Sequence, residues 1–329
     1  MSRNRLVNGA DMILVTGATG FVGRALVDLL VERGCSVRAA MRRAGAFTAA
    51  GASVVMVGDL SAQTDWSAAL AGVEVVVHAS ARVHVMQDAA ANPLLEFRRI
   101  NVQGTLQLAR QAAAKGVRRF VFISSVKVNG EATQPGHPFS ADDAPAPLDA
   151  YGISKMEAEQ GLRELAMQTG MEVVIIRPPL VYGPGVKANF QAMMRWLTRG
   201  VPLPLGAIHN HRSLVALDNL VDLIVTCIDH PAAANQTFLV SDGEDLSTTQ
   251  LLQRMGLALG KRARLIPVPP ALLKLGAALV GRPAIAQRLC GSLQVDISKT
   301  RQLLGWSAPV SVDAGLKKAA EGYWREASV

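Results

Sequence analysis

Short apolar runs alternate with longer amphipathic segments over the first 180 residues of the chain. The valine- and isoleucine-rich runs predict strands at 12–16, 36–41, 53–57, 73–78, 120–123 and 172–177. Segments with helical spacing of apolar residues predict helices at 22–33, 62–71, 95–115 and 151–169. This alternation predicts βαβ units and therefore an α/β fold with a Rossmann-type doubly wound parallel sheet.

Turn-forming residues become frequent after the last of these strands. Pro178-Pro179, 183–185 (Gly-Pro-Gly) and 202–204 (Pro-Leu-Pro) predict loops and chain reversals. We therefore expect a nucleotide-binding domain over 12–178, to which 213–241 returns. A smaller, mainly helical substrate-binding lobe is expected over 179–212 and 242–329.

A glycine-rich motif stands between the first predicted strand and the first predicted helix. In this position the first glycine permits a tight turn, the second lets the backbone approach a pyrophosphate, and the third lets helix pack on strand. An ordinary glycine-rich turn is the alternative, and the strand–turn–helix context favours dinucleotide binding. The expected cofactor contacts in the motif are Gly17, Thr19, Gly20, Phe21, Val22 and Gly23.

The second predicted strand ends in Met41-Arg42-Arg43, where many dinucleotide sites carry a carboxylate for the adenosine ribose. A guanidinium at Arg42 suits a 2′-phosphate, so the sequence favours NADP(H) over NAD(H). A solvated basic turn is the alternative. Asp59 and Leu60 follow the third strand, where Asp59 could accept the adenine amino group or simply cap a helix.

Three residues form a candidate catalytic set: Ser125, Tyr151 and Lys155. Ser125 follows a strand at the carboxyl edge of the predicted sheet, and Tyr151 and Lys155 are four residues apart on one helical face. An ammonium near a phenol favours the phenolate, which would lower the pKa of Tyr151 from its usual value of about 10. Tyr151 could then exchange a proton with a carbinol or carbonyl oxygen that Ser125 orients. An ordinary surface helix face is the alternative for an isolated Tyr-x-x-x-Lys pair.

Composition narrows the possible partners. The formal charge is +8, but lysine and arginine are scattered in ones and twos, which favours small phosphorylated ligands over nucleic acid. Cys35, Cys227 and Cys290 have neither disulfide-framework nor zinc-ligand spacing, so we expect no metal site and a reduced, cytoplasmic setting. The N-terminus shows no signal-peptide pattern. The apolar stretch 271–280 is too short to span a bilayer, and a core or dimer helix or surface association remains open.

Motifs along nearly the whole chain give it a family resemblance. They are TGATGFVG (16–23), GDL (58–60), VVHASA (76–81), NVQGT (101–105), FISSVKVNGE (122–131), YGISK (151–155), RPPLVYGPG (177–185), RSLVALDNLVDLI (212–224) and LGW (304–306). The chain thus resembles the extended short-chain dehydrogenase/reductases, in the branch of NAD-dependent epimerase/dehydratase proteins acting on nucleotide sugars. The resemblance implies a UDP- or dTDP-sugar bound between two lobes, NAD(P)(H) as cofactor, and a homodimer.

The resemblance also implies roles for individual residues. Tyr151 is the acid/base, Lys155 holds the nicotinamide ribose and tunes Tyr151, and Ser125 contacts the reacting oxygen. Further cofactor contacts are expected from His78, Ala79, Ser80, Asn101 and Pro178, with Asn101 supporting the active-site helix. Substrate contacts are expected from Arg82, Ser125, Lys127, Asn189 and Arg212. A helix cap for Asn189 and a rim salt bridge for Arg212 are the alternatives, and the family's Arg-Pro-Gly-Asp element is not recognisable around 288–291.

The residues after Ser125 discriminate among the family's reactions. Relatives that act as 4,6-dehydratases carry Asp-Glu there, whereas this chain has Val126-Lys127. SSVKVNGE, VYGPGVKANF and PLPLG resemble 4-ketoreductases of polysaccharide (O-antigen lipopolysaccharide) biosynthesis, which reduce UDP-2-acetamido-2,6-dideoxy-xylo-hexos-4-ulose to UDP-N-acetylquinovosamine. We take this reduction as the first expectation. A UDP-N-acetylhexosamine (UDP-glucose type) 4-epimerase is the alternative, ahead of a 3β-hydroxysteroid-type dehydrogenase and an NAD(P)-sensing regulator.

Overall fold

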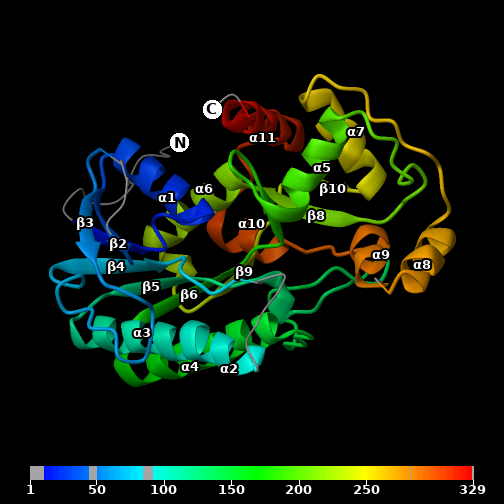
Figure 1. Cartoon of the computed structure of the whole chain (residues 1–329). Helices are drawn as coiled ribbons and strands as arrows, with labels where there is room; N and C mark the ends of the chain where they lie inside the picture. Colours follow the sequence, from blue (N-terminus) through cyan, green and yellow to red (C-terminus); the bar gives the residue numbers. More distant parts are fainter. Residues whose placement is uncertain (1–10, 44–49, 84–91, 282, 328–329) are drawn as a thin grey trace.

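A computed structural model describes residues 11–43, 50–83, 92–281 and 283–327 (Figure 1). Its centre is a seven-stranded sheet with the order β3-β2-β1-β4-β5-β6-β9, in which every neighbouring pair is parallel. The strands are β1 (Met12–Thr16), β2 (Ser36–Met41), β3 (Ser53–Met56), β4 (Val73–His78), β5 (Arg119–Ile123), β6 (Glu172–Arg177) and β9 (Thr237–Leu239). This confirms the doubly wound α/β fold. The strand order reverses at β1, so the switch point lies where β1 and β4 end.

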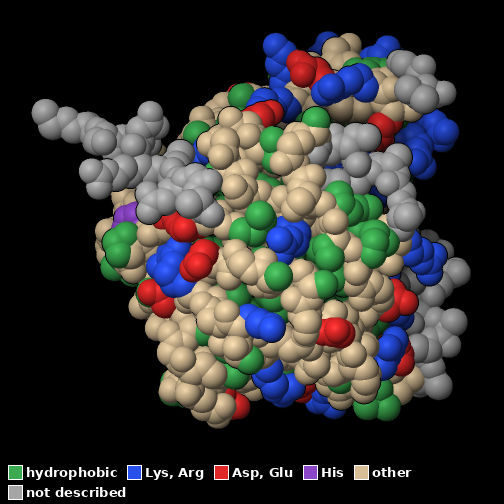
Figure 2. Space-filling view, turned by 90° about the vertical axis from the view of Figure 1, so that its left-hand side faces the viewer, with side chains coloured by type: hydrophobic (Ala, Val, Ile, Leu, Met, Phe, Trp, Pro, Cys, Tyr) green, Lys and Arg blue, Asp and Glu red, His purple; other side chains and the backbone are tan. Residues whose placement is uncertain are grey.

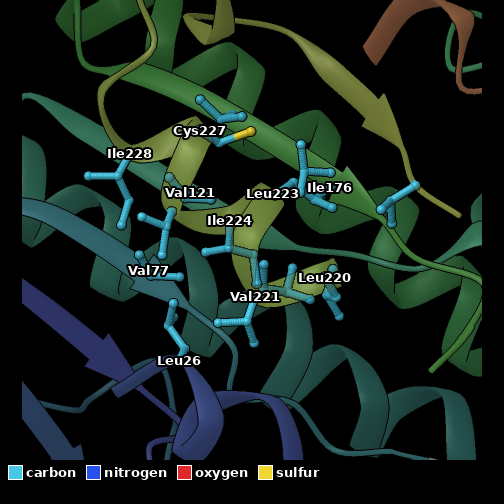
Figure 3. Close-up of a cluster of buried hydrophobic side chains, with 14 of the residues drawn as sticks. Leu26, Val77, Val121, Ile176, Leu220, Val221, Leu223, Ile224, Cys227 and Ile228 are labelled. Atoms are coloured by element: carbon cyan, nitrogen blue, oxygen red, sulfur yellow. The ribbon is translucent and has the colours of Figure 1, made fainter. Parts of the chain in front are cut away.

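Helices cover both faces of this sheet because its strands are apolar on both sides. Ile13 and Val15 of β1 face one core, and Leu14 faces the other. The first core is covered by α1 (Phe21–Glu32) and α6 (Leu217–Asp229), and the second by α3 (Thr105–Ala114) and α4 (Ala150–Thr169). Figure 3 shows α6 side chains such as Ile224 meeting Leu26 of α1 and Val77 of β4.

A smaller lobe lies beside the carboxyl edge of the large sheet (Figure 1). Its sheet has the order β10-β8-β7, and its own apolar core includes residues from α5, α7 and α11. The elements are β7 (Leu180–Tyr182), α5 (Ala188–Thr198), β8 (Arg212–Ala216), β10 (Asp245–Leu246), α7 (Thr248–Ala258), α8 (Pro270–Leu279), α9 (Pro283–Cys290) and α11 (Val312–Ala327).

The chain crosses between the two cores more often than two boundaries would require. Within 213–241, β8 pairs in the small sheet whereas α6 and β9 join the large one. Near the C-terminus α10 (Ser298–Leu304) also returns, and Leu304 and Trp306 pack in the core of the large sheet. The expected division into two lobes stays a prediction.

The helix predicted at 62–71 is wrong, because the segment consists of turns. Short polar side chains compete there for the backbone groups that a helix would use. Thr64 donates its hydroxyl to the Asp59 carbonyl at 2.7 Å and accepts from the Ser61 amide at 2.9 Å. Gln111 of α3 stabilises this turn conformation, because its side chain accepts a hydrogen bond from the Trp66 amide and donates one to the Thr64 carbonyl.

Candidate active site

The glycine motif forms a tight loop between β1 and α1. Gly17 has φ +68°, and a Cβ on it would lie 2.8 Å from the Ser80 amide nitrogen. A Cβ on Gly23 would lie 2.1 Å from the Gly17 carbonyl oxygen. Any side chain at either position would therefore displace neighbouring backbone. The two glycines thus allow the loop to lie close against the end of β4, at the switch point of the sheet.

The start of α1 fits the diphosphate of a dinucleotide. Helices α4 and α7 begin with side-chain caps, from Asp149 and Ser247, whereas the N-cap of α1 is Gly20 and provides no side-chain cap. The first-turn amides of α1 therefore have no side-chain cap, and the helix dipole favours an anion there. Thr19 is exposed beside them, as expected of a residue that contacts a cofactor.

The ends of β2 and β3 place a guanidinium beside a carboxylate. Arg42 Nη1 lies 3.7 Å from Asp59 Oδ1, and both side chains are exposed. The end of β2 has no carboxylate of its own, but one is present on the segment that follows the neighbouring strand β3. Leu60, which we expected to touch the cofactor, is buried; a Cβ on Gly104 would lie 2.6 Å from its Cγ.

His78 ends β4 but its side chain points into the core. Its Nδ1 lies 2.7 Å from the Thr16 hydroxyl and its Nε2 lies 3.0 Å from the Thr105 hydroxyl. Burial, followed by the charge of Lys155, lowers the pKa of His78 to about 3. The ring is therefore a neutral, hydrogen-bonded core group, and the backbone that faces Gly17 is that of the next two residues, Ala79 and Ser80. Both of these residues are partly exposed.

The structure brings the three candidate catalytic residues together. Ser125 follows β5, and its hydroxyl lies close enough to the phenol of Tyr151, in the first turn of α4, to lower the pKa of that phenol. Lys155 lies one turn later with its side chain buried, where Nζ donates to the Ile123 carbonyl at 2.6 Å. The same ammonium lies 4.1 Å from the centre of the Phe122 ring, a cation–π distance.

The pKa values of this set correct one expectation. Burial and the charge of Asp149 raise the pKa of Tyr151 to about 12, while the nearby Ser125 hydroxyl lowers it by less. Lys155 does not act on the phenol here because its Nζ faces the Ile123 carbonyl; burial lowers its pKa to about 7, against the charge of Glu159. The expected lowering of the Tyr151 pKa is thus reversed in this arrangement.

Asp149 and Lys127 form an ion pair beside the phenol. Asp149 also caps α4, since its Oδ1 accepts from the Gly152 amide at 2.7 Å. Lys127 additionally lies 3.3 Å from Glu131, and its backbone amide donates to the Ser125 hydroxyl at 3.2 Å. The side chain expected to contact substrate therefore already neutralises the carboxylate that acts on Tyr151.

A π-helical segment, η1 (Arg98–Gly104), connects α2 (Pro93–Phe97) to α3 and presents residues to α4. Phe97 lies edge-on to the Tyr151 ring at 6.1 Å, and the Arg82 guanidinium lies 5.6 Å from the Phe97 ring centre. Asn101 donates to the Ser154 hydroxyl at 3.0 Å and accepts from the Arg82 amide at 2.8 Å. These contacts fit a supporting role for Asn101 and add Phe97, which the sequence did not single out.

A buried ionic network lies behind the catalytic set. Glu159, one turn after Lys155, accepts from Nε and Nη2 of Arg177 at 2.9 and 2.6 Å and from the Ser124 hydroxyl at 2.6 Å. Arg177 also donates to Asn129 at 3.0 Å. Pro178, the next residue, is buried and its carbonyl accepts from the Val126 amide at 3.0 Å. The network ties β6 and α4 to the strand end that carries Ser125.

The two substrate residues expected in the small lobe have different environments. Asn189 is exposed in the first turn of α5, whose N-cap is Lys187, so Asn189 is not the cap. Arg212 at the start of β8 donates to the carbonyls of Arg288 and Gly291 at 2.6 and 3.3 Å. Arg212 therefore holds the end of α9 against the start of β8.

Comparisons with known proteins agree with this architecture. Residues 13–241 match the model of the family described as "NAD dependent epimerase/dehydratase family". The chain is 51% identical over 313 residues to a UDP-glucose 4-epimerase of Vibrio cholerae, covering 94% of this chain and 95% of that one. Among solved structures, MoeE5 in complex with UDP-glucose and NAD has a TM-score of 0.76 at 25% identity, covering 96% and 99%. The UDP-glucose 4-epimerase of Thermotoga maritima with UDP-glucose also has a TM-score of 0.76, at 23% identity, covering 97% and 100%.

The fold and the site define an α/β protein with a glycine loop between β1 and α1 and a Ser–Tyr–Lys set. Within that class, the chain belongs to the NAD dependent epimerase/dehydratase family.

Proposed function

We propose that the protein is an NAD-dependent 4-epimerase of UDP-hexoses or UDP-N-acetylhexosamines. The observation that carries the proposal is the 51% identity, over 94% of the chain, to a UDP-glucose 4-epimerase, together with the assembled Ser125, Tyr151 and Lys155. This favours the epimerase over the ketoreductase that the sequence motifs put first.

The protein residues supply the proton chemistry of such a reaction. Bound NAD would take a hydride from the 4-carbon of the sugar and return it to the opposite face. Tyr151 accepts the proton of the 4-hydroxyl and gives it back, while Ser125 holds the reacting oxygen by a hydrogen bond. The phenol with a pKa of about 12 is set to donate at neutral pH. Accepting a proton requires the phenolate, which the Lys155 ammonium stabilises by turning from the Ile123 carbonyl.

The geometry around Arg42 supports NAD as the coenzyme. Asp59 lies 3.7 Å from Arg42, so a 2′-phosphate placed on Arg42 would also meet a carboxylate. The same carboxylate can accept a hydrogen bond from a ribose hydroxyl. MoeE5, of similar fold, is described as a complex with NAD. The sequence expectation of NADP(H) is therefore replaced by NAD(H) in this proposal.

A reductase of a 4-keto-6-deoxy UDP-N-acetylhexosamine is the second candidate. It is favoured by the end of β2, where Met41 and Arg42 offer no carboxylate of their own for a retained coenzyme. A reductase consumes reduced coenzyme mole for mole, whereas an epimerase shows no net change in it.

One assay separates the two candidates. Purified protein is incubated with UDP-glucose and with UDP-N-acetylglucosamine without added coenzyme, and the sugars are identified by NMR. If the protein is an epimerase, each sugar should be converted to its 4-epimer, and NAD should be released when the protein is denatured. If neither sugar changes, and the 4-keto-6-deoxy substrate instead oxidises added NADH or NADPH stoichiometrically, the epimerase proposal is wrong and the reductase is correct.

A further inference from the structure

Helix α8 is unusual in this structure because none of its residues is buried although most are apolar. Leu272, Leu275 and Leu279 are exposed, and so is Val280, which follows the helix. Leu279 is 81% exposed and Val280 71%. Figure 1 shows α8 and α9 together at one extremity of the small lobe, away from the large sheet. Such a concentration of exposed apolar side chains marks a contact surface.

A groove beside α8 extends the apolar surface. It has a volume of about 310 Å³ and runs between the end of α5, the segment after it, α8 and α9. Its lining is almost wholly apolar and includes Trp196, Leu203, Leu205, Leu273, Ala277 and Leu289. Trp196 and Ile285 stand partly exposed at this groove. We call the exposed residues Leu272, Leu275, Leu279, Val280, Ile285 and Trp196 the α8–α9 surface.

The chain segments that build this surface are positively charged throughout. Residues 247–295 contain seven lysines and arginines and no aspartate or glutamate. Residues 178–217, which include α5, contain four and again no acidic residue. By contrast, Figure 2 shows lysine and arginine interspersed with aspartate and glutamate on the side of the molecule that bears β3. The positive charge of the protein is therefore concentrated in the lobe that carries the exposed apolar residues.

We propose that the α8–α9 surface docks on the surface of an anionic lipid bilayer. Leucine side chains of α8 enter the boundary between headgroups and acyl chains, while Lys274 and Arg288 reach the anionic headgroups. Within the described ranges no helix is long and apolar enough to cross a membrane, so this contact is peripheral.

Charge favours an anionic bilayer over a second copy of the chain as the partner of the α8–α9 surface. A two-fold interface would place the same surface of both copies together, and with it two sets of basic residues. An anionic bilayer instead offers opposite charge and an apolar layer to the same residues. The proposal is independent of which UDP-sugar the active site accepts.

Vesicle binding tests the proposal. The full-length protein is sedimented with vesicles of phosphatidylcholine alone and with vesicles containing phosphatidylglycerol, over a range of salt concentrations. We expect binding to the anionic vesicles that weakens as salt increases, and brominated acyl chains should quench the fluorescence of Trp196, with W196F as the reference. Absence of binding to anionic vesicles at low salt would overturn the proposal.

Paired variants locate the contact. Leu279→Gln should lower the partition coefficient more than about tenfold, and Lys274→Gln about fivefold. The matched controls are Met167→Gln on α4, whose side chain is also 81% exposed, and Arg110→Gln on α3; both should bind as the wild type does. Equal losses in the controls would overturn the placement. So would a protein dimer that Leu279→Gln dissociates, because a second copy would then cover this surface.

Discussion

Glu159 and Arg177 form an ion pair in which both side chains are at most 2% exposed. The pair joins α4 to β6, and Glu159 also accepts from Ser124, the residue before Ser125. Burying a charged pair has a desolvation cost, which the close contact and hydrogen bonds between the two partners offset. Removing one partner would therefore leave the other as a buried, uncompensated charge. The stability of the large domain and the placement of Ser125 therefore depend on the same two side chains.

Glu159→Gln should lower the free energy of unfolding by about 3–5 kcal/mol, because it leaves the Arg177 guanidinium buried without its carboxylate. Urea denaturation measures the change. Glu157→Gln on the same helix is the control: Glu157 pairs with the more exposed Arg98, and its loss should cost at most about 1 kcal/mol. Similar losses for the two variants would contradict the assigned importance of the buried pair.

Tyr151→Phe should reduce turnover by about a hundredfold or more, since it removes the proton-exchanging hydroxyl and keeps the ring against Phe97. Binding of NAD, measured by calorimetry, should remain close to that of the wild type. A variant that keeps the wild-type rate would show that another group exchanges the proton.

Asp149→Asn should lower the pKa of Tyr151 from about 12, because the negative charge that disfavours the phenolate disappears while asparagine still caps α4. The limb of the pH–rate profile governed by Tyr151 should move to lower pH. Lys127→Gln is the opposite test: it removes the ammonium that neutralises Asp149 and should move that limb to higher pH. Shifts in the same direction for both variants would refute this electrostatic account.

His78 should make stability decline in acid. Its pKa is about 3 when folded and about 6.5 when unfolded, so the unfolded chain binds the extra proton between these values. Stability is complete above about pH 6.5 and falls by up to about 4 kcal/mol as the pH approaches 3. NMR titration should find the His78 ring neutral down to about pH 3, and a ring that protonates above pH 5 would disprove the assignment.

Arg42→Asp should weaken NADP(H) binding at least about tenfold, because a 2′-phosphate there already meets Asp59 and would exchange the neighbouring guanidinium for a second carboxylate. NAD(H) binding should change little, since Asp59 remains for the ribose. Fluorescence titration with both reduced coenzymes measures the effect, with Arg43→Asp as the matched control. Equal loss of both coenzymes would show that Arg42 acts on binding in another way.

The strands were predictable because each is a short valine- and isoleucine-rich run, and β1, β2, β4 and β6 have the bounds expected from sequence. The segment 62–71 was not, because its apolar spacing was overridden by hydrogen bonds from Thr64 and Gln111. Local pattern decides an element only where side chains do not offer the backbone other partners.

The same distinction holds for the site. The glycine loop and the pair Tyr151 and Lys155 follow from spacing alone, since both are local. Glu159, Arg177 and Phe97 could not be found that way, because their importance comes from burial and from contacts between distant parts of the chain. The direction in which the Lys155 ammonium points is likewise set by the Ile123 carbonyl, which no motif reveals.

The number of residues in the π-helical segment η1 determines how Phe97 is oriented toward Tyr151. Removing one residue from it would let the helix continue with regular α-helical bonds, and each residue of an α-helix turns the chain by about 100°. Thr105 would keep its bond to His78, while Phe97 would rotate away from Tyr151. A deletion that makes the segment α-helical would thus remove the contact of Phe97 with the Tyr151 ring, while the bond between α3 and the sheet stayed in place. Neighbouring side chains can adjust to a substitution in η1, but they cannot reverse the rotation that the loss of one residue imposes on the helix.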